Sequence, residues 1–141
     1  MPGEFYIEGK KEKISVVEIL TKIDQLLKLR RSTQSGDKVM TADYAAVYEE
    51  KAEAAYIFAG AKIDLTSMQA GDAIDVRVRT RLKDSGNYVA LAEDSYTGVQ
   101  PDNKKAIRIT AIPDNYGVEI AMRQTAGSLR VIPCEFFDAK S

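Results

Sequence analysis

A regular alternation of apolar and polar residues in the second half of the chain most constrains its fold. Within the segment AIDVRVRTRLK, residues 73–83, the even positions carry Ile, Val, Thr and Leu, and the odd positions after Ala73 carry Asp, Arg and Lys. A period of two places successive side chains on opposite faces of a strand. The segment is therefore predicted to be a β-strand with one buried face and one polar face.

Turn-forming sequences then interrupt the chain at short intervals. They are DSGN, TGVQPDNKK, PDNYG and AGS, and each supplies the Gly, Pro, Asn or Asp that tight turns require. The segments between them are predicted strands, as are two earlier ones near 45–53 and 55–65. Short strands separated by turns predict a mainly β protein, an antiparallel β-sandwich or jelly roll over residues 39–141.

Only one segment before the sandwich has a clear helical pattern. SVVEILTKIDQLLKLRR begins with a capping box, Ser15 and Glu18, and its apolar residues recur at helical spacing. An amphipathic helix is predicted over 14–31, after an N-terminal arm (1–13) and before a polar linker (32–38). Its apolar face either packs on the sheet of its own chain or contacts the same helix in other copies. The residues predicted to make the second contact are spaced by four, three and four positions: Val16, Leu20, Ile23 and Leu27.

Composition excludes several classes of site. The chain of 141 residues has no histidine, one cysteine, and 20 basic against 21 acidic residues. The usual Ser/His and Cys/His catalytic pairs and most zinc sites are thereby removed. No nucleotide-binding glycine loop, signal peptide or membrane-length apolar run is found. We expect no enzyme activity, no cofactor, no metal and no membrane association.

The polar residues that remain have simpler interpretations than catalysis. Asp94, Asp102, Asn103, Asp114 and Asn115 fall in or beside loops, where such residues commonly form turns rather than hold calcium. Glu93 with Asp94, or Glu135 with Asp138, match a glycosidase pair by residue type alone. Cys134 lies in the apolar segment VIPCEFF and is predicted to be a buried, unreactive thiol.

The arginine row is the strongest candidate for a binding surface. Arg77, Arg79 and Arg81 occupy one face of the predicted strand, where bidentate contacts to carboxylates or phosphates are available. Three interpretations remain open: a solvated polar face, a protein interface, and a nucleic-acid surface. The chain is slightly acidic overall, so nucleic acid is not an expected partner.

The region from about Phe58 to Lys140 resembles a set of small, mostly uncharacterised proteins of tailed phages and archaeal viruses. The segments that carry the resemblance are IDL followed by MQAGD, then YTGVQ, YG and QTAG. The resemblance implies a virion structural protein, either a capsid decoration protein or a minor capsid or tail-associated subunit. It also implies a homo-oligomer that contacts other virion proteins and is assembled in the host cytoplasm.

A subunit of this kind works through adhesive surfaces. The residues predicted to make contacts are a docking arm (Phe5, Tyr6, Ile7), the helix face (Val16, Leu20, Ile23, Leu27) and the arginine row (Arg77, Arg79, Arg81). The main alternative is a ligand-binding sandwich, for example a carbohydrate-binding module that uses Tyr88, Tyr96 and Tyr116. A cellular protein of another role, whose helix completes its core, is a further alternative.

Overall fold

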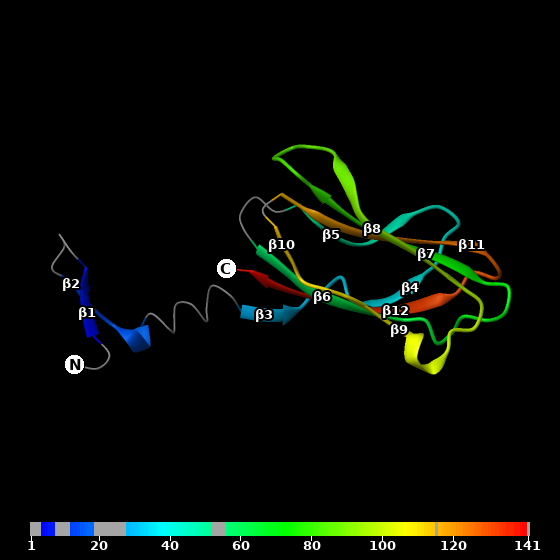
Figure 1. The fold of residues 1–141 in the computed structure, drawn as a ribbon, viewed down its shortest axis with the longest axis horizontal. Helices are drawn as coiled ribbons and strands as arrows, with labels where there is room; N and C mark the ends of the chain where they lie inside the picture. The colour runs from blue at the N-terminus through cyan, green and yellow to red at the C-terminus, as the bar shows by residue number, and fades with distance from the viewer. Residues whose placement is uncertain (1–3, 8–11, 19–27, 52–55, 115, 141) are drawn as a thin grey trace.

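The computed structural model is a sandwich of two antiparallel β-sheets, visible as an upper and a lower layer in Figure 1. It describes residues 4–7, 12–18, 28–51, 56–114 and 116–140. The predicted fold class, mainly β with antiparallel sheets, is confirmed. No helix in this part of the chain has the length and apolar character needed to span a membrane.

The larger sheet is built around two long central strands, β6 (Tyr56–Asp64) and β12 (Val131–Lys140), which pair with each other. Two short strands share the far edge of β6, namely β9 (Ala106–Ile109) and β10 (Ile112–Asp114). Two more share the far edge of β12, namely β3 (Lys28–Arg31) and β4 (Gly36–Val39). This sheet of six strands is therefore only four strands wide at any point.

The smaller sheet has the order β5-β11-β7-β8. Its strands are β5 (Ala45–Glu50), β7 (Ala73–Arg81), β8 (Tyr88–Thr97) and β11 (Val118–Ala126). The chain crosses back to the larger sheet through a loop that contains the short 3-10 helix η1 (Asp102–Lys104). These bounds agree closely with the strands that alternation predicts from residue 45 onward.

Apolar side chains from both sheets fill the space between them. Strand β7 is buried at every second residue, as its sequence predicts. Tyr48 of the smaller sheet contacts two rings of the larger one, with centroids 5.1 Å from Phe58 and 5.2 Å from Phe136. All three are fully buried, and contacts of this kind make the two sheets one cooperative core.

The N-terminal region departs from the prediction. Strands β1 (Glu4–Ile7) and β2 (Glu12–Ser15) pair in a separate two-stranded sheet, which Figure 1 places beside the sandwich. Residues 16–18 are helical, while 19–27 lie outside the described residues. The helix predicted over 14–31 is wrong at both ends, because 14–15 belong to β2 and 28–31 form β3.

The predicted linker over 32–38 is also incorrect, and the sandwich begins at Lys28 rather than at residue 39. Residues 32–35 form a turn that interrupts an edge strand, since β3 and β4 both pair with β12 on either side of it. The Ser35 hydroxyl accepts a hydrogen bond from the N–H of Phe136 (2.9 Å), and the N–H of Ser32 donates to the Phe136 carbonyl (2.8 Å). Pairing with an exposed sheet edge thus overrides the local preferences of these residues.

Candidate interaction surfaces

The arginine row lies on the outer face of the smaller sheet, as the alternation of β7 predicts. The three side chains are nevertheless largely covered: 20% of Arg77, 28% of Arg79 and 14% of Arg81 is exposed. They lie over the neighbouring strand β11, where Ala121 is only 1% exposed. The outer face of this sheet therefore carries a layer of its own arginine side chains.

A carboxylate on β11 holds the middle of the row. Nη2 of Arg79 lies 2.6 Å from Oε1 of Glu119, and Nη2 of Arg77 lies 3.8 Å from the same oxygen. Register explains the contact, because Glu119 is directly opposite Arg79 in the β7–β11 ladder. Glu119 is itself mostly buried, so the pair is shielded from solvent on both sides.

Two tyrosines complete the layer. The Tyr44 ring lies between two guanidinium groups, with its centroid 4.0 Å from Cζ of Arg77 and 4.4 Å from Cζ of Arg123. The Tyr88 ring lies 5.3 Å from Cζ of Arg79 and 5.9 Å from that of Arg81. These distances fit cation–π contacts, which are most favourable when the cation is partly desolvated.

Asp75 lies at one end of this layer, and Tyr88 and Gly117 lie at the other. Asp75 accepts hydrogen bonds from Ser95 (2.7 Å) and Arg123 (2.7 Å), and these donors hold the pKa of its carboxyl below the usual value. At the other end, burial raises the pKa of Tyr88. A Cβ at Gly117 would lie 3.1 Å from the Tyr88 hydroxyl and 3.0 Å from the Glu50 carbonyl oxygen, and φ there is +148°, so glycine is favoured at this position.

The guanidinium groups of the row are thus engaged within the chain. Among the described residues, Nε of Arg77 and Nε of Arg81 are buried polar atoms without a hydrogen-bond partner, as is the Tyr88 hydroxyl. The remaining interactions balance the charge of the row against nearby carboxylates. The cations of the row are therefore held mainly by groups of the chain itself.

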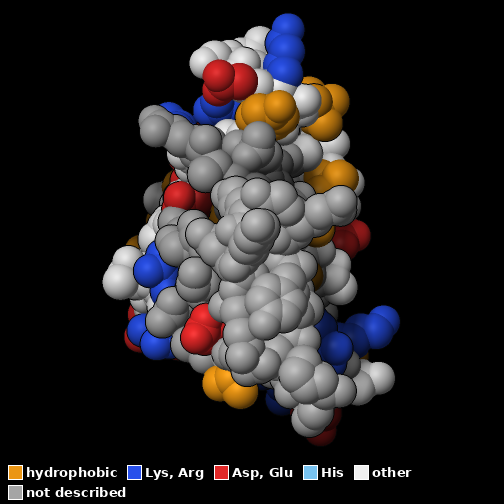
Figure 2. Space-filling view, turned by 90° about the vertical axis from the view of Figure 1, so that its left-hand side faces the viewer, with side chains coloured by type: hydrophobic (Ala, Val, Ile, Leu, Met, Phe, Trp, Pro, Cys, Tyr) orange, Lys and Arg blue, Asp and Glu red, His pale blue; other side chains and the backbone are white. Residues whose placement is uncertain are grey.

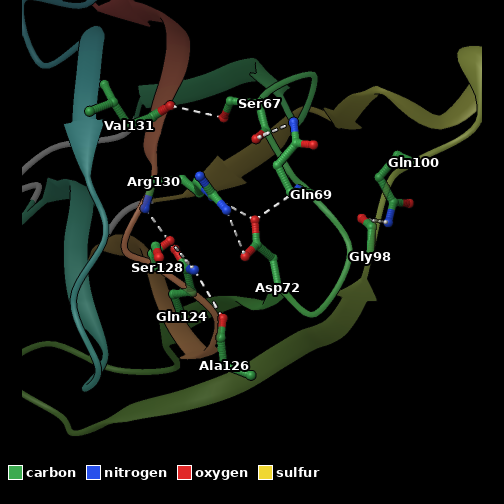
Figure 3. Close-up of polar contacts among 10 residues, drawn as sticks. All are labelled: Ser67, Gln69, Asp72, Gly98, Gln100, Gln124, Ala126, Ser128, Arg130 and Val131. Carbon is green, nitrogen blue, oxygen red and sulfur yellow. Dashed lines mark hydrogen bonds and ion pairs between the residues drawn. The ribbon is translucent and has the colours of Figure 1, made fainter.

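MQAGD, YTGVQ and QTAG, three of the segments that carry the resemblance, meet at one end of the sandwich (Figure 3). The YG segment lies at the other end, where the Gly117 carbonyl accepts a hydrogen bond from the N–H of Arg81. Asp72 accepts hydrogen bonds from Nε of Arg130 (2.7 Å) and from the N–H of Gln69 (2.8 Å), and both lower the pKa of its carboxyl. Its carbonyl accepts from the N–H of Gly98 (2.8 Å). Gln100 closes the same loop by donating to the carbonyls of Thr97 and Gly98. MQAGD and YTGVQ therefore form one corner.

Gln124, the first residue of QTAG, organises the adjoining turn. Its Nε2 donates to the carbonyls of Ala126 (2.9 Å) and Ser128 (2.7 Å), and its Oε1 accepts from the N–H of Arg130 (2.9 Å), as Figure 3 shows. Gly127 has φ of +85°, and a Cβ there would overlap the Asp72 carboxylate. The motifs thus build a corner from buried polar contacts, which is a structural task.

A hydrophobic surface that the sequence analysis did not identify lies on the β7–β8 hairpin. Leu82 is 74% exposed, Leu91 55% and Val89 41%. The hairpin rises above the rest of the sandwich in Figure 1, and hydrophobic side chains gather at the top of the molecule in Figure 2. No described strand pairs with the outer edge of β8. An unpaired edge with apolar side chains is a typical contact surface.

A cleft of about 210 Å³ separates β8 from β9, where the two sheets part at this edge. Its walls are apolar, with Val76 and Ile107 among the lining residues, and Asp94 and Arg108 lie at its rim. Tyr96 also lines the cleft, whereas Tyr88 lies on the opposite face of β8, as the β7–β8 register requires. Tyr88 and Tyr96 therefore do not form a common aromatic platform.

The other candidate groups are not brought together as a reactive centre. Glu135 pairs with Arg31 on β3, and Asp138 pairs with Arg30 and accepts a hydrogen bond from Tyr48. Burial raises the pKa of Cys134 to about 12. In the described residues, no three His, Cys, Asp or Glu side chains form a group that could hold a metal.

The remaining predicted contact residues fall in the N-terminal region. Phe5, Tyr6 and Ile7 form β1, which pairs with β2. Val16 is 41% exposed, whereas Leu20, Ile23 and Leu27 lie outside the described residues. The predicted helix face and docking arm remain predictions.

No protein-family model matches the sequence, and no curated protein matches it significantly. The fold is similar to solved structures of infectious bursal disease virus. The Gx strain gives a TM-score of 0.45 and 11% identity over 80% of this chain and 33% of that chain. The VP2 subviral particle gives a TM-score of 0.46 and 9% identity over 79% and 32%. The chain thus spans about a third of the length of these relatives.

Proposed function

We propose that this chain is a structural subunit of a virus particle that works through protein–protein contacts. The observation that carries the proposal is the β7–β8 hairpin, which exposes Leu82, Val89 and Leu91 beside an unpaired strand edge. Exposed apolar side chains next to free backbone hydrogen-bonding groups favour addition of another protein. The motifs that resemble viral proteins support the viral setting.

Within that class, we propose a decoration protein or a minor capsid or tail-associated subunit. A body held together by an apolar core and buried corners presents its contact surfaces without a ligand or a disulfide. Partners in this proposal are other copies of the chain and other virion proteins, with assembly in the host cytoplasm. The chain is proposed to have no enzyme activity.

Particle association tests the proposal. The chain is expressed together with the virion structural proteins of the same genome. Particles are then separated on a density gradient, and copies per particle are measured by mass spectrometry. We expect the chain to migrate with particles at a fixed ratio. Its absence from particles formed with every neighbouring structural protein would refute the proposal.

A matched pair of variants tests the hairpin itself. Leu91→Glu places a charge on the hairpin surface, and Leu129→Glu places one at a residue that is equally exposed, 56% against 55%, in the turn before β12. We expect only the first to reduce copies per particle. Equal loss from both variants would show that the hairpin is not the contact surface.

The cleft between β8 and β9 supports the second candidate, a ligand-binding sandwich. Tyr96 and the rim residues Asp94 and Arg108 offer one aromatic and two charged contacts around an apolar floor. A glycan array distinguishes this function from the first. Saturable binding that Tyr96→Ala removes would favour it, and absence of binding would leave the structural role.

A further inference from the structure

Arginines of both sheets pair with acids of the same chain. On the smaller sheet, arginines pair with Glu119 and Asp75. On the larger sheet, Arg31 pairs with Glu135. Lys62 of β6 lies between Glu135 of β12 and Arg108 of β9 in the ladders, and both Lys62 and Arg108 are exposed. Among the residues that the structure describes, no carboxylate forms an ion pair with either cation. Like charges directly opposite each other on a sheet are destabilising.

Beside these two cations lies a hollow of about 310 Å³. Its lining is apolar and small, with Ala59, Ala111 and Phe137 among the residues that form it. Gly60 keeps its floor open, because a Cβ there would lie only 2.9 Å from the carbonyl oxygen of Ile109. We name this surface, Lys62, Arg108 and the apolar lining, the cationic hollow. Its chemistry fits an acidic segment that also carries an apolar side chain.

The chain itself contains such a segment. Strand β8 is exposed along most of its length and carries Leu91, Glu93 and Asp94 within four residues. Neither acid forms an ion pair with a described residue. Glu93 lies opposite Arg77 on the outer face of the sheet, and Asp94 lies opposite Val76 on the inner face, where it lines the same cleft as Arg108. The two acids therefore flank the open edge of β8 from opposite faces. Leu91 supplies an exposed apolar side chain next to the acids. We name Leu91, Glu93 and Asp94 the acidic segment.

We propose that the acidic segment of one copy docks on the cationic hollow of a second copy. Charge complementarity carries the inference: two cations that form no ion pair lie beside an apolar hollow, and two acids that form no ion pair flank an open strand edge beside an exposed leucine. The contact neutralises both sets and relieves the repulsion between Lys62 and Arg108. The inference deepens the proposed function, on which it rests, by naming the partner of one surface.

The two docking surfaces are different parts of the chain, so each copy offers both. A contact between unlike surfaces repeats from copy to copy and produces closed rings or open chains. This property suits a subunit present in many copies. It also makes the contact testable, because each surface can be altered while the other is kept.

Charge reversal separates the two surfaces. Sedimentation velocity over a concentration series to about 100 µM measures self-association. We expect the double variant K62E/R108E to weaken association by about tenfold or more, and E93K/D94K to do the same. The control K51E/K83E changes net charge as much as K62E/R108E does, at two exposed lysines outside both surfaces, and is expected to leave association unchanged. Circular dichroism verifies that each variant is folded.

Recombining the surfaces gives the sharper result. Mixing K62E/R108E with E93K/D94K restores one contact, because each protein keeps one unaltered surface, and a one-to-one complex is expected. The quadruple variant, with both surfaces reversed, regains self-association. A wild-type chain that stays monomeric to about 100 µM, equal weakening by the control, or failure of the mixture to associate would overturn the inference. Particle association through other proteins would be unaffected by that outcome, so the proposed function is tested separately.

Discussion

Replacing Gly127 by alanine tests whether the motif corner holds the two sheets together. Gly127 has φ of +85°, and an added Cβ would overlap the Asp72 carboxylate and lie 2.9 Å from the Cα of Asp72. Asp72 is 2% exposed, so its carboxylate cannot move aside without leaving Arg130 and the Gln69 N–H. The substitution therefore adds a steric clash to an unfavourable backbone conformation.

The chain provides a matched control for the backbone contribution. Gly71 has φ of +88°, but a Cβ there meets no atom within 4 Å. Gly71→Ala is expected to cost about 1 kcal/mol, the strain of a left-handed alanine. Gly127→Ala adds displacement of a buried contact and is expected to cost about 3 kcal/mol in total. In thermal terms the larger cost corresponds to a fall in Tm of about 10 °C.

Thermal and urea unfolding followed by circular dichroism measure both variants. In an Asp72→Ala background, the cost of Gly127→Ala should fall but stay above that of Gly71→Ala, because the carboxylate is gone while the Cα of residue 72 remains 2.9 Å from the added Cβ. Equal destabilisation by the two glycine variants would refute the steric argument. Additive costs of Gly127→Ala and Asp72→Ala would refute it as well.

Three further predictions concern titration, reactivity and the edge strand. Burial raises the pKa of the Cys134 thiol to about 12, so in the folded protein this thiol should react with a disulfide reagent only as fast as the protein unfolds. The absorbance of the released reagent product, with and without urea, measures this reaction rate. Arg30→Gln should lower amide-exchange protection in β3 and the end of β12 while protection in β7 is unchanged, because Asp138 loses the cation that ties β3 to the sheet. Stability from pH 5 to 8 should be nearly flat, since the chain has no histidine. It should fall as pH drops below about 4.5. Hydrogen bonds lower the pKa of four carboxyls in the folded state, those of Asp64, Asp72, Asp75 and Glu135. Their contribution to the free energy of unfolding is therefore complete above the unfolded pKa values of 3.8 and 4.5, and it is lost as the pH falls below them. Acid titration followed by circular dichroism measures this loss of stability.

Local patterns in the sequence account for most of the sandwich. The strands from residue 45 onward follow from alternation and turn residues, because both signals are local and one face of each strand is buried. The pattern failed at 28–31, where helical spacing and good helix formers preceded an edge strand. There the decisive partner is Asp138, more than one hundred residues away, and no local signal reports it.

The candidate surfaces were predictable only where one strand carries them. The arginine row shares β7 and was identified, but its tyrosine partner Tyr44 lies in a turn far from it in sequence. The β7–β8 hairpin was identified as a turn, while the exposure of its leucines depends on how far it extends beyond the other strands. The Lys62–Arg108 pair depends on the register between β6 and β9, which two isolated sequence segments do not reveal.

The ion pairs within the chain indicate which charged surface is available to a protein partner. A net charge of −1 describes a chain in which acids and bases are nearly equal in number, yet the fold distributes their partners unevenly. The arginine row, which attracts attention in the sequence, is held by Glu119 and two tyrosine rings within the chain, although Nε of Arg77 and Nε of Arg81 have no hydrogen-bond partner among the described residues. Opening that layer for a partner would break existing contacts, whereas a partner at Lys62 and Arg108 would relieve repulsion and break none. The arginine row on the smaller sheet is therefore the less favourable docking surface, and the Lys62–Arg108 pair on the larger sheet is the more favourable one.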